Sequence, residues 1–168
     1  MSVNENITLN IKWKIEKFKA KDSEEIARKG IKPYETVCSE KDILQHEGII
    51  AIAYLIAGIG AAKTKWDNTN ARIGVGNSAQ GPTDTDGGLI GASKTYKGMN
   101  ATYPQLLVDH NIVFQSDFID TEAEYAWLEE TIVNAATDTG DNLCRQNTSL
   151  GTKPAGQTWR VTGTVTFT

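Results

Sequence analysis

The sequence predicts a mainly β fold: an antiparallel β-sandwich or barrel-like body with one buried α-helix at about residues 40–58. Two observations favour it. Segments at both ends of the chain alternate apolar and polar residues with a period of two, as half-buried strands do. One segment combines the length and the wide apolar surface of a covered helix. A chain of 168 residues is typical of one domain, here with an N-terminal strand and arm at 1–35 and a β-rich body at 36–168.

The first element expected along the chain is a strand. In "ITLNIKWKI", residues 7–15, apolar side chains share one face and polar side chains share the other. The charged segment 19–33 ends in Gly30 and Pro33 and predicts a loop or one short helical turn. The segment "YETVC", residues 34–38, predicts a second short strand.

The helix follows. Ser39 stands at the N-cap position and Asp42 comes three residues later, close to the capping-box pattern. Two neighbouring apolar stripes predict a helix that is covered on most sides. Gly58 and Gly60 are expected to end it, as glycines often do at a helix C-terminus.

The rest of the chain predicts strands. We expect them at residues 71–75, 93–103, 105–108, 112–119, 124–136 and 158–167. A hairpin turn is expected at 109–111 and a further turn at "DTGDN". The segment 124–136 also fits a helix, but Tyr125, Trp127 and Glu129 alternate and favour a strand. In the last strand Gly163 interrupts the buried side and predicts a bulge or a close neighbour.

The stretch "ARIGVGNSAQGPTDTDGG", residues 71–88, could bind a ligand in two ways. The spacing of Gly74, Gly76 and Ala79 fits G-x-G-x-x-A, a dinucleotide loop, but that loop must open a helix and Pro82 forbids one. Asp84, Asp86 and Gly87 could instead belong to a calcium-binding loop. The stretch lacks the ligand that such a loop needs at position 88 and the glutamate that it needs near its end. A strand followed by a long turn-rich loop is therefore expected, with no cofactor and no metal.

No catalytic site is predicted either. His46 and His110 stand in no recognisable nucleophile motif. Four acids could supply a carboxylate pair for glycoside hydrolysis, although a solvated surface is the expected role: Glu122, Glu124, Glu129 and Glu130. Four tryptophans are spread along the chain and are expected to pack mainly in the core: Trp13, Trp66, Trp127 and Trp159.

The net charge and the cysteine content limit the classes of partner that we expect. A net charge of −4 argues against nucleic acid, and the apolar stretch 48–62 is shorter than the roughly 18 residues of a membrane span. No secretory signal is recognised at the start, so no membrane partner is expected. Cys38 and Cys144 lack zinc-site spacing and are expected to be two buried free thiols, with one disulfide as the alternative.

A longer pattern begins at residue 66. Residues 66–78 fit F/W-D-N-x-N-A-x-I-G-V-G-[DN]-S, residues 82–89 fit P-x-x-x-D-x-x-L, and residues 94–104 fit K-x-Y-K-x-M-x-x-x-Y-P. Later, 122–136 is similar to E-A-N-F-x-W-x-E-W-G-I and 149–167 to L-G-T-K-x-x-G-x-T-W-x-L-T-V-T-I. These segments resemble small virion proteins of tailed bacteriophages, over most of the chain from about residue 33.

The resemblance departs from the family at two places. Glu130, Thr131 and Ile132 stand where the family has its W-G-I turn, and Gly163 falls inside the final strand. The family has no catalytic residues to carry over, so the resemblance implies structure and assembly. It also identifies residues 71–88 as a family loop without a cofactor.

The resemblance implies a capsid decoration (cement) protein that binds the major capsid protein and stabilises the head shell. Such a protein is located in the virion after synthesis in the bacterial host cytoplasm. A homo-oligomer is expected, with a trimer around the helix as the favoured order. The alternative is a tail, fibre or baseplate component, in which Trp66, Tyr96 and Tyr103 would bind a receptor or a glycan.

Overall fold

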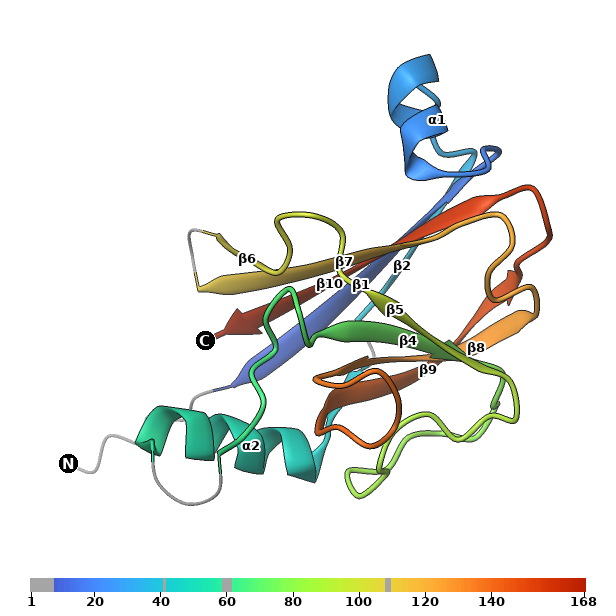
Figure 1. Ribbon diagram of the computed structural model, residues 1–168. Helices are drawn as coiled ribbons and strands as arrows, with labels where there is room; N and C mark the ends of the chain where they lie inside the picture. Colours follow the sequence, from blue (N-terminus) through green and yellow to red (C-terminus); the bar gives the residue numbers. More distant parts are fainter. Residues whose placement is uncertain (1–7, 41, 59–61, 108–109) are drawn as a thin grey trace.

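The computed structural model describes residues 8–40, 42–58, 62–107 and 110–168. They form two five-stranded antiparallel sheets packed as a sandwich, with two short helices (Figure 1). The first sheet has the order β2 (Glu35–Ser39), β1 (Leu9–Phe18), β10 (Thr158–Phe167), β7 (Asn111–Phe118), β6 (Gln105–Leu107). The second has the order β3 (Asp42–Leu44), β9 (Asn142–Thr152), β8 (Ala126–Val133), β4 (Arg72–Gly76), β5 (Lys94–Gly98). The helices are α1 (Ser23–Lys29) and α2 (His46–Ala57). The mainly β prediction is confirmed as a sandwich.

The two strands with the clearest alternation lie side by side in the first sheet. Strand β1 pairs with β10 along its whole length and with β2 on its other edge. The apolar face of β1 points between the sheets, with Ile11, Trp13 and Ile15 buried. Each edge of β1 thus has a partner strand, so this strand of the predicted N-terminal arm is part of the first sheet.

Aromatic side chains fill the centre of the sandwich. The Trp127 ring lies 4.9 Å from that of Phe118 and 4.8 Å from that of Trp159, both in edge-on geometry. Trp13 is also buried, so the predicted core role is confirmed for three tryptophans, while Trp66 is half-buried. Gly163 lies opposite Trp13, and a Cβ there would lie 3.0 Å from the Ile132 side chain. The predicted close neighbour is therefore present.

The predicted helix begins later than expected. Residues 42–44 form β3, which pairs with β9, and Ser39 belongs to β2. Because these residues pair with strands, the capping pattern of Ser39 and Asp42 is not used. The helix begins at His46, and its N-cap residue Gln45 makes no side-chain capping bond. Gly58 ends the helix in the left-handed conformation at φ 64°, as predicted, and Gly60 lies outside the described residues.

Most of the remaining elements follow the predictions, but the eleven-residue strand β9, which lies between β3 and β8, was not expected. The charged segment after β1 forms α1, with the Asp22 side chain accepting a hydrogen bond from the Glu25 amide and Gly30 as the left-handed C-cap. Strands β6 and β7 pair as an antiparallel hairpin, although positions 108–109 of its turn lie outside the described residues. The ambiguous segment 124–136 forms strand β8, and the expected strand at 93–103 is shorter, as β5.

Candidate interaction surface

Helix α2 carries apolar residues on all sides, but the rest of the described chain covers it on one side only. It has no charged residue after Glu47, and of its twelve residues Gly48 and Ala51 are the two classed as buried. Gly48 permits close packing on β9, since a Cβ there would lie 2.7 Å from the Cα of Leu143. The prediction of a helix covered on most sides is therefore wrong for the single chain. Five large apolar side chains of α2 are exposed: Ile49, Ile50, Tyr54, Leu55 and Ile56.

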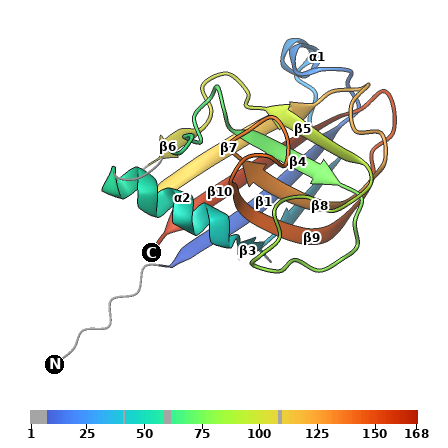
Figure 2. The same cartoon turned by 60° about the horizontal axis from the view of Figure 1, so that its bottom comes forward.

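A groove of about 320 Å³ runs between α2 and the end of the first sheet. From α2 it is lined by Ile52, Leu55 and Ile56, and Trp66 and Leu143 complete that side. From the first sheet it is lined by Leu9, Ile112, Phe114, Val165 and Phe167. Figure 2 shows α2 lying in front of the ends of β7, β10 and β1, which carry these residues. The groove is therefore almost wholly apolar.

Strand β6 extends this apolar region. Leu106 pairs with Ile112, and residues directly opposite in an antiparallel pair project to the same face. Leu106 thus continues the groove floor to the sheet edge, where it is 79% exposed. Figures 1 and 2 both place β6 and α2 at the same end of the sandwich. We call the five exposed α2 side chains together with Leu106 the α2 surface.

The loop between β4 and β5 is organised around one buried ion pair. Glu129 accepts hydrogen bonds from the amides of Ile90 and Gly91, at 3.1 and 2.7 Å, and of Ser78 at 3.3 Å. Arg145 donates to the same carboxylate at 2.7 and 2.9 Å, and both side chains are fully buried. This pair therefore fixes the loop against the outer face of β8.

Glycines make this arrangement possible. Gly76 lies opposite Glu129, and a Cβ on either Gly76 or Gly91 would collide with the Glu129 carboxylate. The Asp86 carboxylate, considered above as a calcium ligand, instead accepts from Arg145 at 2.8 Å and from Thr83. In the described stretch between β4 and β5, no helix follows Gly76. The glycine-rich motif therefore has a packing role in this loop.

Of the four candidate acids, two are not on the surface. Glu129 and Glu130 are both fully buried, so the expectation of a solvated acidic surface is wrong for them. As neighbours in a strand they face opposite sides of β8, Glu129 toward the loop and Glu130 between the sheets. Glu124 is exposed, and Glu122 forms an ion pair with Lys97. The buried two therefore do not face one another across a substrate-sized gap.

A second acidic cluster lies between the sheets. Asp42, Gln146 and Glu130 occupy one row across β3, β9 and β8, and the Gln146 amide donates to Glu130. Burial raises the pKa of Asp42 to about 7, although the Trp13 indole donates to it. Burial, together with the nearby charge of Asp42, raises the pKa of Glu130 well above its usual value. Both carboxyl groups are therefore disposed to hold protons in the folded chain.

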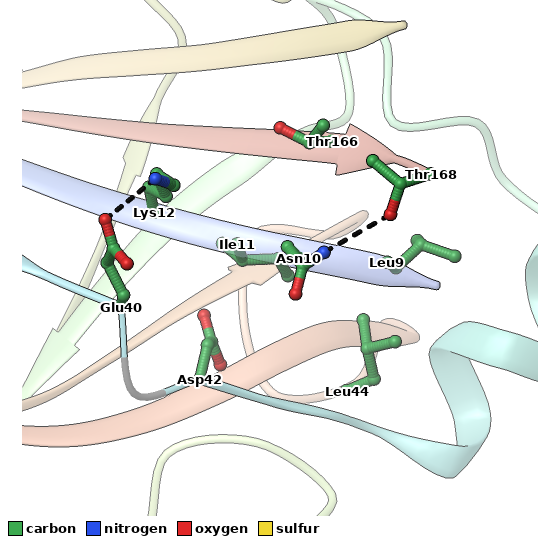
Figure 3. Close-up of a pocket in the computed structure, with 9 residues that line it drawn as sticks. All are labelled: Leu9, Asn10, Ile11, Lys12, Glu40, Asp42, Leu44, Thr166 and Thr168. Atoms are coloured by element: carbon green, nitrogen blue, oxygen red, sulfur yellow. Dashed lines mark hydrogen bonds and ion pairs between the residues drawn. The ribbon is translucent and has the colours of Figure 1, made fainter. Parts of the chain in front are cut away.

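Asp42 also borders an open pocket of about 430 Å³ beside β1 (Figure 3). At the rim, Lys12 and Glu40 form an exposed ion pair at 2.8 Å. Figure 3 shows Asp42 pointing from β3 toward β1, where its Oδ2 accepts from Trp13. Its Oδ1 is buried and has no hydrogen-bond partner among the described residues. The pocket gives water a route to the edge of the acidic cluster.

The remaining sequence candidates are scattered. Cys38 and Cys144 are both free, but Cys38 is exposed because it lies on the edge strand β2, which corrects its predicted burial. His46 opens α2, and His110 precedes β7 with φ 63°. The three aromatic residues proposed for glycan binding are each half-buried: Trp66, Tyr96 and Tyr103.

Sequence reasoning missed Leu106, which carries little signal on its own because only its pairing with β7 places it beside α2. Within the described residues no group of three or more metal-binding side chains is found. None of the described helices has the length and apolar character needed to cross a membrane. Comparisons of the chain with family models, with curated proteins and with solved structures give no match.

Proposed function

We propose that this protein is a structural component of a tailed-bacteriophage virion, a capsid decoration protein that binds the major capsid protein and stabilises the head shell. The phage assignment is supported by the motifs at 66–104, 122–136 and 149–167. The assembly role is supported by one observation above all, the exposed α2 surface. The protein acts by binding other proteins rather than by catalysis.

The α2 surface supports assembly because a helix that is apolar all round is normally buried. Ile56 is 81% exposed and Ile49 is 50% exposed, with no charged side chain between positions 48 and 62. Each of the six side chains of the α2 surface is at least 36% exposed, whereas monomeric proteins rarely expose contiguous apolar patches larger than roughly a few hundred Å². An exposed apolar surface of this kind fits a protein interface.

The rest of the molecule is suited to a rigid support. The loop at 77–93 is held by the buried Glu129–Arg145 pair, and further ion pairs join Lys94 to Asp138 and Lys63 to Asp141, both within 2.8 Å. A loop fixed in this way presents one shape to a neighbouring subunit, which lowers the entropy cost of binding.

The test uses head shells assembled without this protein. Purified full-length chain is added, bound copies per shell are counted, and the temperature at which the shells open is measured. We expect saturable binding at a fixed number of sites and a higher opening temperature. Shells that bind no chain at saturating concentration would refute the decoration role.

The alternative is a tail, fibre or baseplate component that binds a receptor or a glycan. It is favoured by Trp66, whose half-buried side chain lines the apolar groove and offers a flat aromatic surface there. Glycan binding by the purified chain, lost on Trp66→Ala, together with absent shell binding, would select this alternative.

A further inference from the structure

We propose that β1 takes up an extended segment of the head-shell protein as an additional strand, along the edge of residues 9–12. We call this part of the strand the free edge. The inference rests on the proposed function and deepens it, because it names a second contact site and the form of the partner there. It does not depend on what covers the α2 surface.

Strand β1 is longer than the strand that flanks it at the free edge. Strand β2 pairs with residues 13–17 of β1 and ends at Ser39, opposite Trp13. The chain then crosses to the second sheet, where β3 pairs with β9. Among the described residues, no strand pairs with this side of β1 at residues 9–12.

The backbone groups of the free edge point away from the sheet at every second residue. Thr8 and Thr168 exchange both of their backbone hydrogen bonds, at 2.6 and 2.9 Å, so the even-numbered residues of β1 point their N–H and C=O groups toward β10. Leu9 and Ile11 therefore point theirs to the opposite side, beyond the end of β2. Donors and acceptors that alternate along a strand are complementary to another extended backbone.

The space beside the free edge is open. A pocket of about 430 Å³ lies there (Figure 3). From β1 it is lined by two residues of the inner face and two of the outer face: Leu9, Ile11, Asn10 and Lys12. Because it is lined from both faces, the pocket follows the strand edge itself. Asp42 and Leu44 of β3 line it as well, so an added strand contacts both sheets.

Asp42 offers an acceptor to a side chain of the added strand. A residue opposite Ile11 projects to the same face as Ile11, the buried face between the sheets. Figure 3 shows Asp42 pointing from β3 toward β1, and its Oδ1 is buried without a hydrogen-bond partner among the described residues. Buried acceptors are normally paired. A side chain with an N–H or O–H donor is therefore expected at this position of the segment.

The free edge lies next to the α2 surface. Leu9 lines both the pocket beside β1 and the apolar groove beside α2. A head-shell protein that binds the α2 surface therefore has the free edge within reach, which favours it as the source of the strand.

The experiment measures amide hydrogen exchange, residue by residue, in the purified full-length chain, alone and bound to head shells assembled without it. Asn10 and Lys12 are internal controls, because their amides point to β10. In the free chain we expect the amides of Leu9 and Ile11 to exchange at least about ten-fold faster than those of the controls. On shells we expect the same two amides to slow by at least about ten-fold, with the controls unchanged.

Leu9→Pro and Leu9→Ala form a matched pair of variants. Both remove the leucine side chain, but proline also removes the N–H that points to the free edge, and it leaves the hydrogen bonds to β10 in place. We expect Leu9→Pro to bind shells at least about ten-fold more weakly than Leu9→Ala. Circular dichroism and melting temperature check that both variants fold, and the exchange measurement on the wild type stands without them.

Four results would overturn the inference. Slow exchange of Leu9 and Ile11 in the free monomer would show that another part of the chain covers the edge. Slowing that follows protein concentration without shells would assign the edge to a second copy. Shell binding with no change at these two amides would place the contact elsewhere and leave the decoration role standing. A chain that binds no shells would refute the decoration role and, with it, the head-shell protein as the occupant.

Discussion

Replacing Asp42 by asparagine should flatten the dependence of stability on pH. Asp42 has a pKa of about 7 in the folded chain against 3.8 for the unfolded reference. Between these two values the folded chain holds a proton that the unfolded chain releases. The free energy of unfolding of the wild type therefore falls as pH rises from about 4 to about 7. Asparagine keeps a similar shape and an acceptor for the Trp13 indole, but it cannot titrate.

The magnitude follows from the size of the shift. Each pKa unit corresponds to about 1.4 kcal/mol, so a shift of about three units corresponds to about 4 kcal/mol. This is an upper limit, since the pocket beside β1 lets water approach Asp42. Glu130 shifts in the same direction, and part of its shift comes from the charge on Asp42. Asp42→Asn therefore also weakens the contribution of Glu130.

The assay is urea unfolding followed by tryptophan fluorescence at pH 4, 5, 6, 7 and 8. Protein concentration is held constant across the series, because any self-association would make the measured stability depend on it. We expect the two proteins to be similarly stable near pH 4 and the variant to gain up to about 4 kcal/mol over the wild type by pH 8. Parallel stability curves for the two proteins would refute the assignment of a raised pKa to Asp42.

The pKa of Asp117 is shifted down rather than up, so the free energy of unfolding depends on pH with the opposite sign and at lower pH. Burial opposes ionisation of Asp117, but hydrogen bonds from Arg160, Ser23 and Asn100 outweigh it and lower the pKa of Asp117. Its contribution is present above about pH 4 and is lost as pH falls through the lowered value. Together with Asp42, it places the expected stability maximum of the wild type near pH 4–5.

Three further outcomes are expected. Glu129→Gln should lower the free energy of unfolding by about 3–5 kcal/mol, because the buried charge of Arg145 loses the carboxylate of Glu129 that balances it. Exposed Glu124→Gln should change it by less than about 0.5 kcal/mol, and equal effects of the two substitutions in urea unfolding would contradict the ion-pair analysis. Gly163→Val should cost about 1–3 kcal/mol, since even a Cβ would lie 3.0 Å from an isoleucine methyl and 3.3 Å from a tryptophan ring, and an unchanged melting temperature would show that the core yields there. A thiol reagent should modify Cys38 in the folded chain and Cys144 only after unfolding, because burial raises the pKa of the Cys144 thiol, so rapid modification of both would contradict the structure.

Strands β1 and β10 were predictable because one face of each is buried and the other is not. In β1 and β10 the alternation of apolar and polar side chains shows directly which face is buried. The two strands pair over ten residues. The alternation could not show the order of strands, because pairing joins residues as distant as Leu9 and Phe167. It also could not place Leu106, whose position depends on the hairpin with β7.

The errors at Glu129 and Glu130 have a physical cause. Charged residues in a row are usually solvated, and burial of either one depends on a partner far along the chain. Glu129 is compensated by Arg145 on the neighbouring strand, and Glu130 by Gln146 together with a raised pKa. The start of the helix was misplaced for a similar reason, since local capping at Ser39 yields to strand pairing that the local sequence does not contain.

The error about α2 differs from these, because the sequence argument behind it stays valid. An apolar helix predicts that its sides are covered in the working state of the molecule. The chain covers one stripe, at Gly48 and Ala51, and leaves Ile49, Ile50 and Ile56 in contact with solvent. Exposing such residues lowers solubility and brings no stability, and none of the described residues covers them. The mismatch between the apolar pattern and the exposure of these side chains therefore makes α2 the expected contact surface of the proposed assembly.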